Sequence, residues 1–217
     1  MKKMVNRRFA GHIKNIVFLL CLIPFTSLAQ SQQDVNPNGY NKFYYENGKI
    51  SSEGNMRDGR PDGYWKTYLP NGKVKSEGNR KNFELDSLWK FYDGNGKLLT
   101  EINYLSGKKE GIKRAWNPKG FLLGEEQFVA DAKQGTSFDY YMPDDSAQTK
   151  GKIRFQTPFD KGKEHGVAYE YDKEGKIITI MEYVYGVLKR QETINRADKL
   201  GQKQGVWKEF YENGKVK

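Results

Sequence analysis

Side chains that commonly carry catalysis are scarce in this sequence. Beyond residue 29 it holds one histidine, His165, and no cysteine. A general base or a nucleophile needs such a group beside a partner, yet His165 stands directly before a glycine, where polar residues are typical of turns. We therefore interpret His165 as a turn residue and predict a protein that is not an enzyme. A hydrolase built on His165 with Asp144 and Asp145 is the least favoured hypothesis.

The acidic residues form two patterns that could bind a cation or pair with basic side chains. Asp144 and Asp145 are adjacent in a polar stretch, 142–152, which we predict to be a long solvated loop and a candidate binding loop. A calcium site requires a fuller ligand pattern than these two acids supply. Other glutamates recur every 24 residues, as Glu53, Glu77, Glu101 and Glu125. We assign this ladder a structural role in pairing with lysines across strands, and we expect no metal and no cofactor.

The glutamates belong to a repeat that organises most of the chain. Modules begin at residues 39, 63, 87, 111 and 135, in steps of 24 residues. Their turn glycines, with the later equivalents, are Gly48, Gly72, Gly96, Gly120, Gly175 and Gly214. A period of this length indicates an array in which each unit stacks on its neighbours to bury its apolar surface.

Each module is predicted to be a β-hairpin. In the second module, two short runs rich in aromatic and β-branched residues flank Pro70-Asn71-Gly72. Because proline favours the second position of a type I turn, we expect a three-residue loop with Gly72 in the left-handed region, closed by a bulge. Such a loop sets Tyr68 opposite Val74. The equivalent pairs are Tyr44 with Ile50, Tyr92 with Leu98 and Trp116 with Leu122.

The repeated aromatic residues divide into two sets, because alternate residues of a strand share a face. One face should carry a core stripe beside an aliphatic row; its members are Tyr44, Tyr68, Tyr92, Trp116, Tyr140, Tyr171 and Phe210. Trp65, Trp89 and Trp207 should point to the opposite face. The predicted fold is all-β, an elongated single-layer antiparallel sheet of tandem 24-residue β-hairpin repeats.

The module resembles a known family, the bacterial variant of the MORN repeat, through Gly63, Trp65, Tyr68, Asn71, Gly72, Lys73, Val74 and Glu77. The resemblance covers nearly all of the chain after the first 38 residues and implies a scaffold of MORN-type hairpins. Bacterial relatives are often labelled antitoxins of toxin–antitoxin pairs, and eukaryotic MORN proteins are scaffolds and membrane-proximal adaptors. The family implies no catalytic residue.

Residues 1–29 have the pattern of a secretory signal peptide. Five basic residues and no acid accompany an apolar run, 16–25, that is shorter than the roughly 20 residues of a membrane span. We expect cleavage after Ala29 and no transmembrane span in the mature chain. Cys21 follows two bulky leucines, so we do not expect it to be lipidated. The predicted location is the periplasm, the outer membrane surface or the extracellular space.

The charge of the mature chain would be mildly basic. Without the five basic residues of the signal, 32 basic residues remain against 27 acidic ones, a net charge of +5. Lysines follow turn glycines at Lys49, Lys73, Lys97, Lys176 and Lys215. We interpret them as a solvated rim that protects the sheet edge. The alternative is a strip that attracts acidic glycans or phospholipid; nucleic acid is not an expected partner, because the charges are mixed.

The predicted organisation has five parts. A polar leader, 30–38, follows the signal and precedes six hairpins, 39–186. An insertion and lead-in, 187–204, could add a strand at 188–194. Residues 205–217 then begin the repeated module sequence again and stop inside a hairpin. We therefore expect Trp207 to stay uncovered unless further repeats or another chain complete that edge.

These features favour an exported, non-enzymatic scaffold that binds a protein or a cell-envelope component, such as a glycan or a lipid headgroup. The alternative is an antitoxin-like or immunity-like inhibitor of a toxin, which rests on family labelling.

Overall fold

A computed structural model describes residues 34–142, 151–211 and 216–217 of the chain. These residues lie in one compact unit, Asp34–Lys217. The predicted signal peptide with Cys21, the loop aspartates Asp144 and Asp145, and the turn residues Gly214 and Lys215 fall outside the described residues. Within the described ranges the secondary structure is strand without helix, so no helix there could span a membrane.

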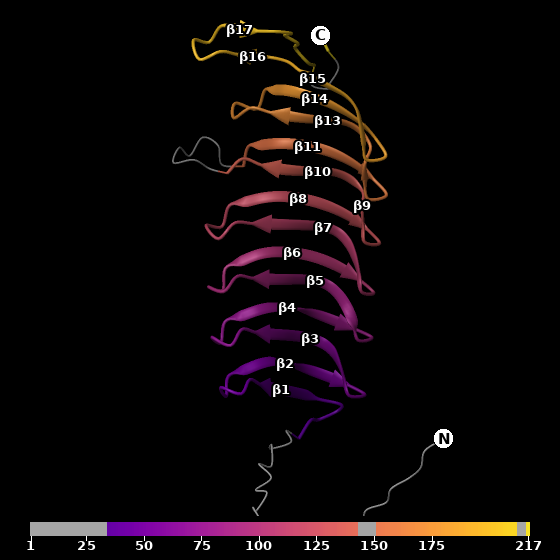
Figure 1. Ribbon diagram of the computed structural model, residues 1–217. Coiled ribbons are helices and arrows are strands. Elements are labelled where there is room, and N and C mark those ends of the chain that lie inside the picture. The colour runs from indigo at the N-terminus through magenta and orange to yellow at the C-terminus, as the bar shows by residue number, and fades with distance from the viewer. Residues whose placement is uncertain (1–33, 143–150, 212–215) are drawn as a thin grey trace, which may run out of the picture. The chain divides into compact units, whose positions relative to one another are not determined.

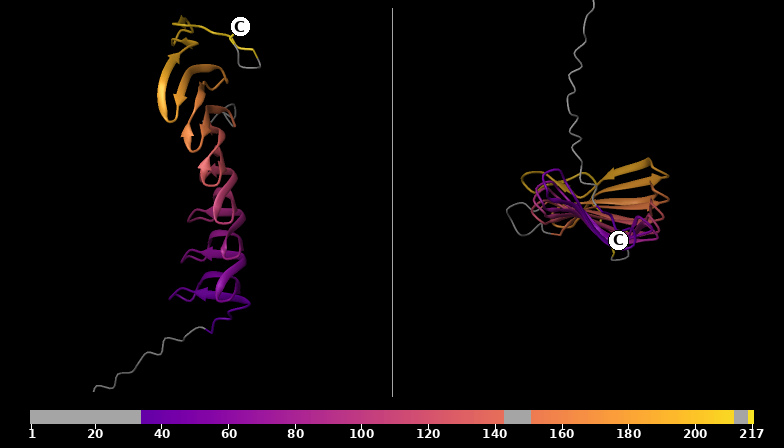
Figure 2. Two further views of the ribbon diagram at one scale, coloured as in Figure 1. Left: turned by 90° about the vertical axis from the view of Figure 1, so that its right-hand side faces the viewer. Right: turned by 90° about the horizontal axis from the view of Figure 1, so that it is seen from below.

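The fold is one long antiparallel sheet in a single layer, in which the strands succeed one another in sequence order (Figure 1). Its main path runs through β1 Tyr40–Tyr44, β2 Ile50–Arg57, β3 Arg60–Tyr68, β4 Val74–Lys81, β5 Glu84–Tyr92, β6 Leu98–Leu105, β7 Lys108–Trp116, β8 Leu122–Val129, β10 Gly135–Tyr140, β11 Ile153–Asp160, β13 Gly166–Tyr171, β14 Ile177–Val184 and β15 Val187–Thr193. Two short strands, β9 Ala132–Lys133 and β12 Lys163–Glu164, pair beside this path, and β16 Arg196–Ala197 with β17 Lys203–Gln204 forms a separate pair. Successive strands are rotated relative to one another, as the view from below shows (Figure 2), which is the usual twist of a sheet. The all-β single-layer prediction is confirmed.

The loops at one edge have the predicted three-residue geometry. In the β3–β4 loop, Leu69 N donates to Lys73 O and Gly72 N donates to Leu69 O, at 2.8 and 2.7 Å. Gly72 has a φ of 91°, a conformation that glycine adopts without strain. Tyr68 lies opposite Val74 beside a bulge. The same register joins Tyr44 to Ile50, Tyr92 to Leu98 and Trp116 to Leu122.

The turns at the other edge are two-residue connections with positive φ at both positions, the pattern of type I′ turns. Most place glycine second, as in Asp58-Gly59. The β4–β5 turn uses Asn82 and Phe83, at 51° and 72°, and the β8–β9 turn uses Ala130 and Asp131, at 47° and 72°. The tight turn is therefore retained where the glycine is lost.

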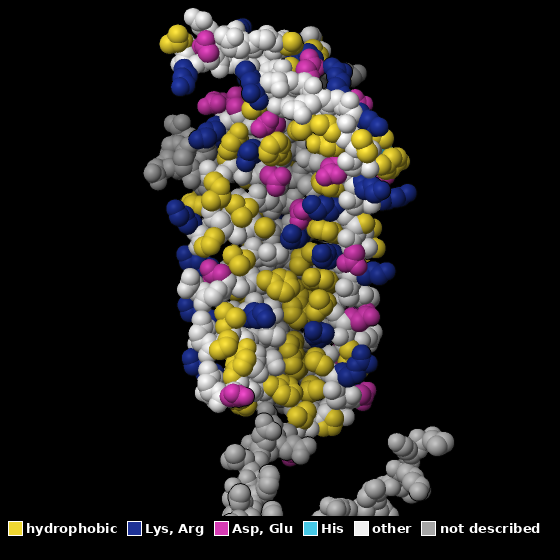
Figure 3. Space-filling model, in the orientation of Figure 1, with side chains coloured by type: hydrophobic (Ala, Val, Ile, Leu, Met, Phe, Trp, Pro, Cys, Tyr) yellow, Lys and Arg dark blue, Asp and Glu magenta, His cyan; other side chains and the backbone are white. Residues whose placement is uncertain are grey.

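The two tryptophans of the central hairpins are buried on one face, which we call the tryptophan face. Trp65 and Trp89 are 7% and 3% exposed. Gly78 lies opposite both residues in the sheet, and Trp89 packs directly over it. Figure 3 shows one face of the molecule, with hydrophobic side chains gathered in a band over β1–β8 and basic side chains mostly along the edges.

Candidate interaction surface

The opposite face carries a ladder of tyrosine–carboxylate hydrogen bonds, and we call it the tyrosine face. Tyr92 Oη donates to Glu77 at 2.6 Å, and Tyr140 Oη donates to Glu125 at 2.7 Å. Tyr68 makes the same bond to Glu53, and Tyr171 donates to Gln156 at 2.9 Å. In every pair the residues are 15 positions apart. Four tyrosines of the predicted core stripe therefore form a hydrogen-bonded ladder.

Basic side chains complete this ladder. Lys42 pairs with Glu53 at 3.7 Å, and Lys66 pairs with Glu77 at 3.4 Å, which confirms the predicted pairing with lysines for two of the four glutamates. Trp116 occupies a tyrosine position and has no hydroxyl to offer Glu101. Arg114 instead bridges Glu101 and Glu125, at 3.2 and 2.7 Å.

Ionisation in the ladder favours a structural role. The hydrogen bond from Tyr140, followed by that from Arg114, lowers the pKa of Glu125. Burial, and then the bond to Glu125, raises the pKa of Tyr140 to about 12. The carboxylate is therefore ionised and the phenol neutral at physiological pH. An acid and a base whose pKa values are driven apart in this way do not exchange a proton near neutrality.

Beside the ladder lies a row of exposed apolar side chains, which we call the outer row. It consists of Tyr40, Tyr64, Leu88, Ile112 and Val167, with exposed fractions of 54, 51, 39, 41 and 42%. Each member is the second residue of its module. In the fifth module Thr136 stands at this position. The directly paired residues are Asn55, Asn79, Asn103, Gln127 and Glu182. An apolar row flanked mainly by amides therefore crosses successive hairpins.

The lysines after the turn glycines are not simply a solvated rim. Lys49 Nζ donates to Asn71 O at 3.0 Å, and Lys73 Nζ donates to Asn95 O at 2.9 Å. Each bond joins a loop to the loop of the next hairpin. In the sixth hairpin the ammonium of Lys176 lies 3.7 Å from the centre of the Trp207 ring. These three lysines are exposed, as predicted for a solvated rim, and they also connect neighbouring repeats.

His165 serves the local turn structure. Its backbone N–H donates to Pro158 O at 3.0 Å. The ring stacks on Tyr185 at 4.4 Å, and Nδ1 accepts the Tyr185 N–H at 3.4 Å. Among the residues that the structure describes, no three His, Cys, Asp or Glu side chains are grouped to hold a metal. The hydrolase hypothesis also needs Asp144 and Asp145, which lie outside the described residues.

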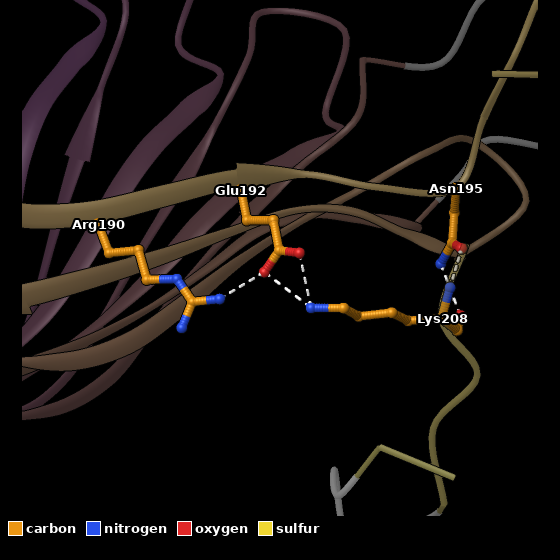
Figure 4. Close-up of polar contacts among 4 residues, drawn as sticks. All are labelled: Arg190, Glu192, Asn195 and Lys208. Carbon is orange, nitrogen blue, oxygen red and sulfur yellow. Dashed lines mark hydrogen bonds and ion pairs between the residues drawn. The ribbon is translucent and has the colours of Figure 1, made fainter. Parts of the chain in front are cut away.

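A polar cluster holds the C-terminal segment, residues 195–211 and 216–217, against β15, the last strand of the long sheet (Figure 4). Glu192 of β15 accepts bonds from Arg190 and from Lys208, all at 2.7 Å. The Asn195 side chain binds both backbone groups of Lys208, at 2.7 and 2.9 Å.

The ring of Trp207, which belongs to this segment, is partly covered, contrary to the prediction that it would stay uncovered. The Trp207 ring is half-buried, with the ammonium groups of Lys176 and Lys203 at 3.7 and 4.4 Å from its centre. The prediction failed because residues 195–208 fold back on the sixth hairpin instead of extending the sheet. Phe210 still pairs with Val216, the same spacing as Tyr44 with Ile50.

Sequence reasoning missed the outer row and the tyrosine–carboxylate bonds. The sequence contained a signal for each. Hydrogen-bonded partners in the ladder are always 15 residues apart, and an apolar residue follows every module start except that of the fifth module, where Thr136 stands. They were overlooked because aromatic residues at strand positions were assigned to a core. A single-layer sheet has no second layer to bury such a row.

Comparison with known protein families found a similar repeat. The family model described as MORN repeat variant matches residues 37–58, 61–82, 85–105, 164–185 and 203–217. No curated protein matches the chain. MORN repeats are in general modules that bind proteins or membranes; a bacterial source and an antitoxin role stay predictions. Over these five segments the chain is similar to the MORN repeat variant, and its long sheet of successive hairpins is consistent with tandem repeats of that kind.

Proposed function

We propose that this chain is an exported, non-enzymatic repeat scaffold that binds a protein or cell-envelope component along its tyrosine face. The observation that carries the proposal is the outer row, which repeats at one position through four consecutive hairpins and again in the sixth. Exposed apolar side chains in a continuous arrangement mark interaction sites. Export rests on the signal-like sequence of residues 1–29.

The geometry suits an extended partner. Two strands separate equivalent side chains of neighbouring hairpins, a distance of about 10 Å at the usual strand spacing. The row therefore offers one apolar contact in each hairpin except the fifth, with an amide or acid beside each for hydrogen bonding. Apolar anchors surrounded by polar groups are typical of binding surfaces.

The test uses the purified full chain as bait in a cell-envelope extract. The variant Leu88→Ser with Ile112→Ser removes two members of the outer row that have no role in the tyrosine–carboxylate ladder. Leu200→Ser is the matched control, because Leu200 is 83% exposed and lies outside the sheet. We expect a saturable partner that the double variant binds at least about tenfold more weakly and that the control retains.

Two results would contradict the proposal. One is equal capture by the native chain and the double variant, with both shown to be folded by circular dichroism. The other is the absence of any saturable partner. N-terminal sequencing of the protein from the envelope fraction checks export separately, with Gln30 as the expected first residue.

A further inference from the structure

Side-chain bonds connect the first three loops along one edge of the sheet and do not continue, among the described residues, from the third loop to the fourth. Lys49 and Lys73 each donate to a carbonyl in the next loop, at 3.0 and 2.9 Å. The amides of Asn47 and Asn71 do the same, at 3.1 and 3.0 Å. Within the described part of the chain, Lys97 makes no equivalent bond from the β5–β6 loop to the β7–β8 loop.

A second connection is missing at the same junction. In the first hairpin, Tyr45 Oη reaches forward to Tyr68 O at 2.6 Å, and Tyr141 makes the same bond in the fifth hairpin. Asp93 takes this position in the third hairpin. Its Oδ1 turns back and accepts two N–H groups of its own loop, including that of Lys97, at 2.8 Å. A carboxylate held in this way makes no bond to the next hairpin.

A cavity of about 410 Å³ lies at this junction, and we call it the loop slot. Its lining is Lys97, Leu98, Trp116, Lys119 and Gly120. Trp116 and Leu98 are half-buried and supply apolar surface, whereas both lysines are exposed. Among the described residues, neither ammonium group has an ion pair or a hydrogen bond. The slot therefore combines an apolar wall with two lysine side chains, of which Lys97 also interacts with the nearby Asp93 carboxylate.

The sixth hairpin also has an aspartate at this position and a cavity nearby. Asp172 stands at the position of Asp93, and its Oδ1 accepts the Lys176 N–H at 2.7 Å. A cavity of about 360 Å³ lies there as well, against the C-terminal segment. Glu209 lines that cavity, so its charge is mixed, unlike that of the loop slot.

We propose that the loop slot binds a small aromatic carboxylate. The ring of the ligand packs on Trp116 and Leu98, and its carboxylate lies between the ammonium groups of Lys97 and Lys119. Aromatic pairs and charge-assisted hydrogen bonds are the two interactions that these side chains provide. The slot lies at the loop edge and not on the outer row, so its test and the test of the proposed function succeed or fail separately.

The probe is indole-3-acetate, titrated into the full chain by calorimetry, with indole-3-acetamide as the neutral counterpart. We expect saturable binding of the carboxylate, weaker at high salt, and at least about tenfold weaker binding of the amide, because a charge-assisted hydrogen bond is worth roughly that factor. The variant Asp93→Tyr should obstruct the slot, because it places a ring at the position from which Tyr45 and Tyr141 reach the next hairpin. It should lose at least tenfold in affinity.

A second variant keeps the test decisive if Asp93→Tyr does not fold. Lys97→Gln with Lys119→Gln should weaken indole-3-acetate at least about tenfold, whereas Lys75→Gln, an exposed lysine of β4, should change nothing. The proposal is overturned if the amide binds as well as the carboxylate. It is equally overturned if either slot variant binds like the native chain, or if the native chain shows no saturable binding at millimolar probe.

Discussion

Replacing Gly78 by alanine should destabilise the protein through a clash with Trp89. A Cβ atom at residue 78 would lie 2.4 Å from Cδ2 and 2.5 Å from Cγ of Trp89. The ring is 3% exposed, and its Nε1 donates to Asn79 O at 2.8 Å, so it cannot move aside without losing that bond. We expect Gly78→Ala to lower the free energy of unfolding by about 1–3 kcal/mol, the usual cost of overpacking.

Removing the ring should abolish this cost. Trp89→Ala alone should lower the free energy of unfolding by about 3–5 kcal/mol. In the double variant the new methyl group occupies space that the ring has left. Gly78→Ala should then be neutral, or stabilising by up to about 1 kcal/mol, because alanine restricts the unfolded chain. The coupling energy between the two sites is expected to be about 1–3 kcal/mol.

The assay is urea unfolding followed by far-ultraviolet circular dichroism. The native chain, the two single variants and the double variant are compared with the same slope of unfolding free energy against urea concentration. Gly94→Ala is the matched control, since a Cβ there meets no atom within 4 Å and its φ is not positive. It should change the unfolding free energy by less than about 0.5 kcal/mol. An equal effect of Gly78→Ala with and without the Trp89 ring would refute the packing argument.

Three further predictions concern the ladder and an edge turn. The pKa of Glu125 is lowered by Tyr140 and then Arg114, so the stability that Glu125 contributes is present above the ordinary pKa of 4.5 and is lost as pH falls through the lower folded pKa. Glu125→Gln should therefore flatten the loss of stability below about pH 5. An unchanged acid profile in urea titrations would count against this prediction. Burial and the bond to Glu125 raise the pKa of Tyr140 from 10.0 to about 12, so its contribution is present below 10.0 and is lost as pH rises toward 12; Tyr140→Phe should flatten that alkaline loss, and a native-like profile would oppose this assignment. Ala130→Gly should raise the unfolding free energy by about 0.5–1 kcal/mol, because Ala130 has a φ of 47°; a lower urea midpoint would contradict it.

The sequence by itself determined the hairpin, its loop and its register. Proline and asparagine before Gly72 specify a three-residue loop, and this loop fixes Tyr68 opposite Val74 because side chains alternate along a strand. The repeat of 24 residues then extends one hairpin to an array. Local chemistry and strict periodicity are both readable without contacts.

The tertiary structure decided how the repeats touch one another. Only the stacking of strands brings Tyr140 within reach of Glu125, places Trp89 over Gly78 and turns Lys73 into a link between loops. Each of these contacts depends on side-chain direction in a neighbouring hairpin, which a period does not specify. The loop slot arises in the same way, because Leu98 and Trp116 belong to neighbouring hairpins that only the sheet sets side by side. The local sequence determines the connections within a hairpin, whereas the connections between hairpins follow from the three-dimensional register of the sheet.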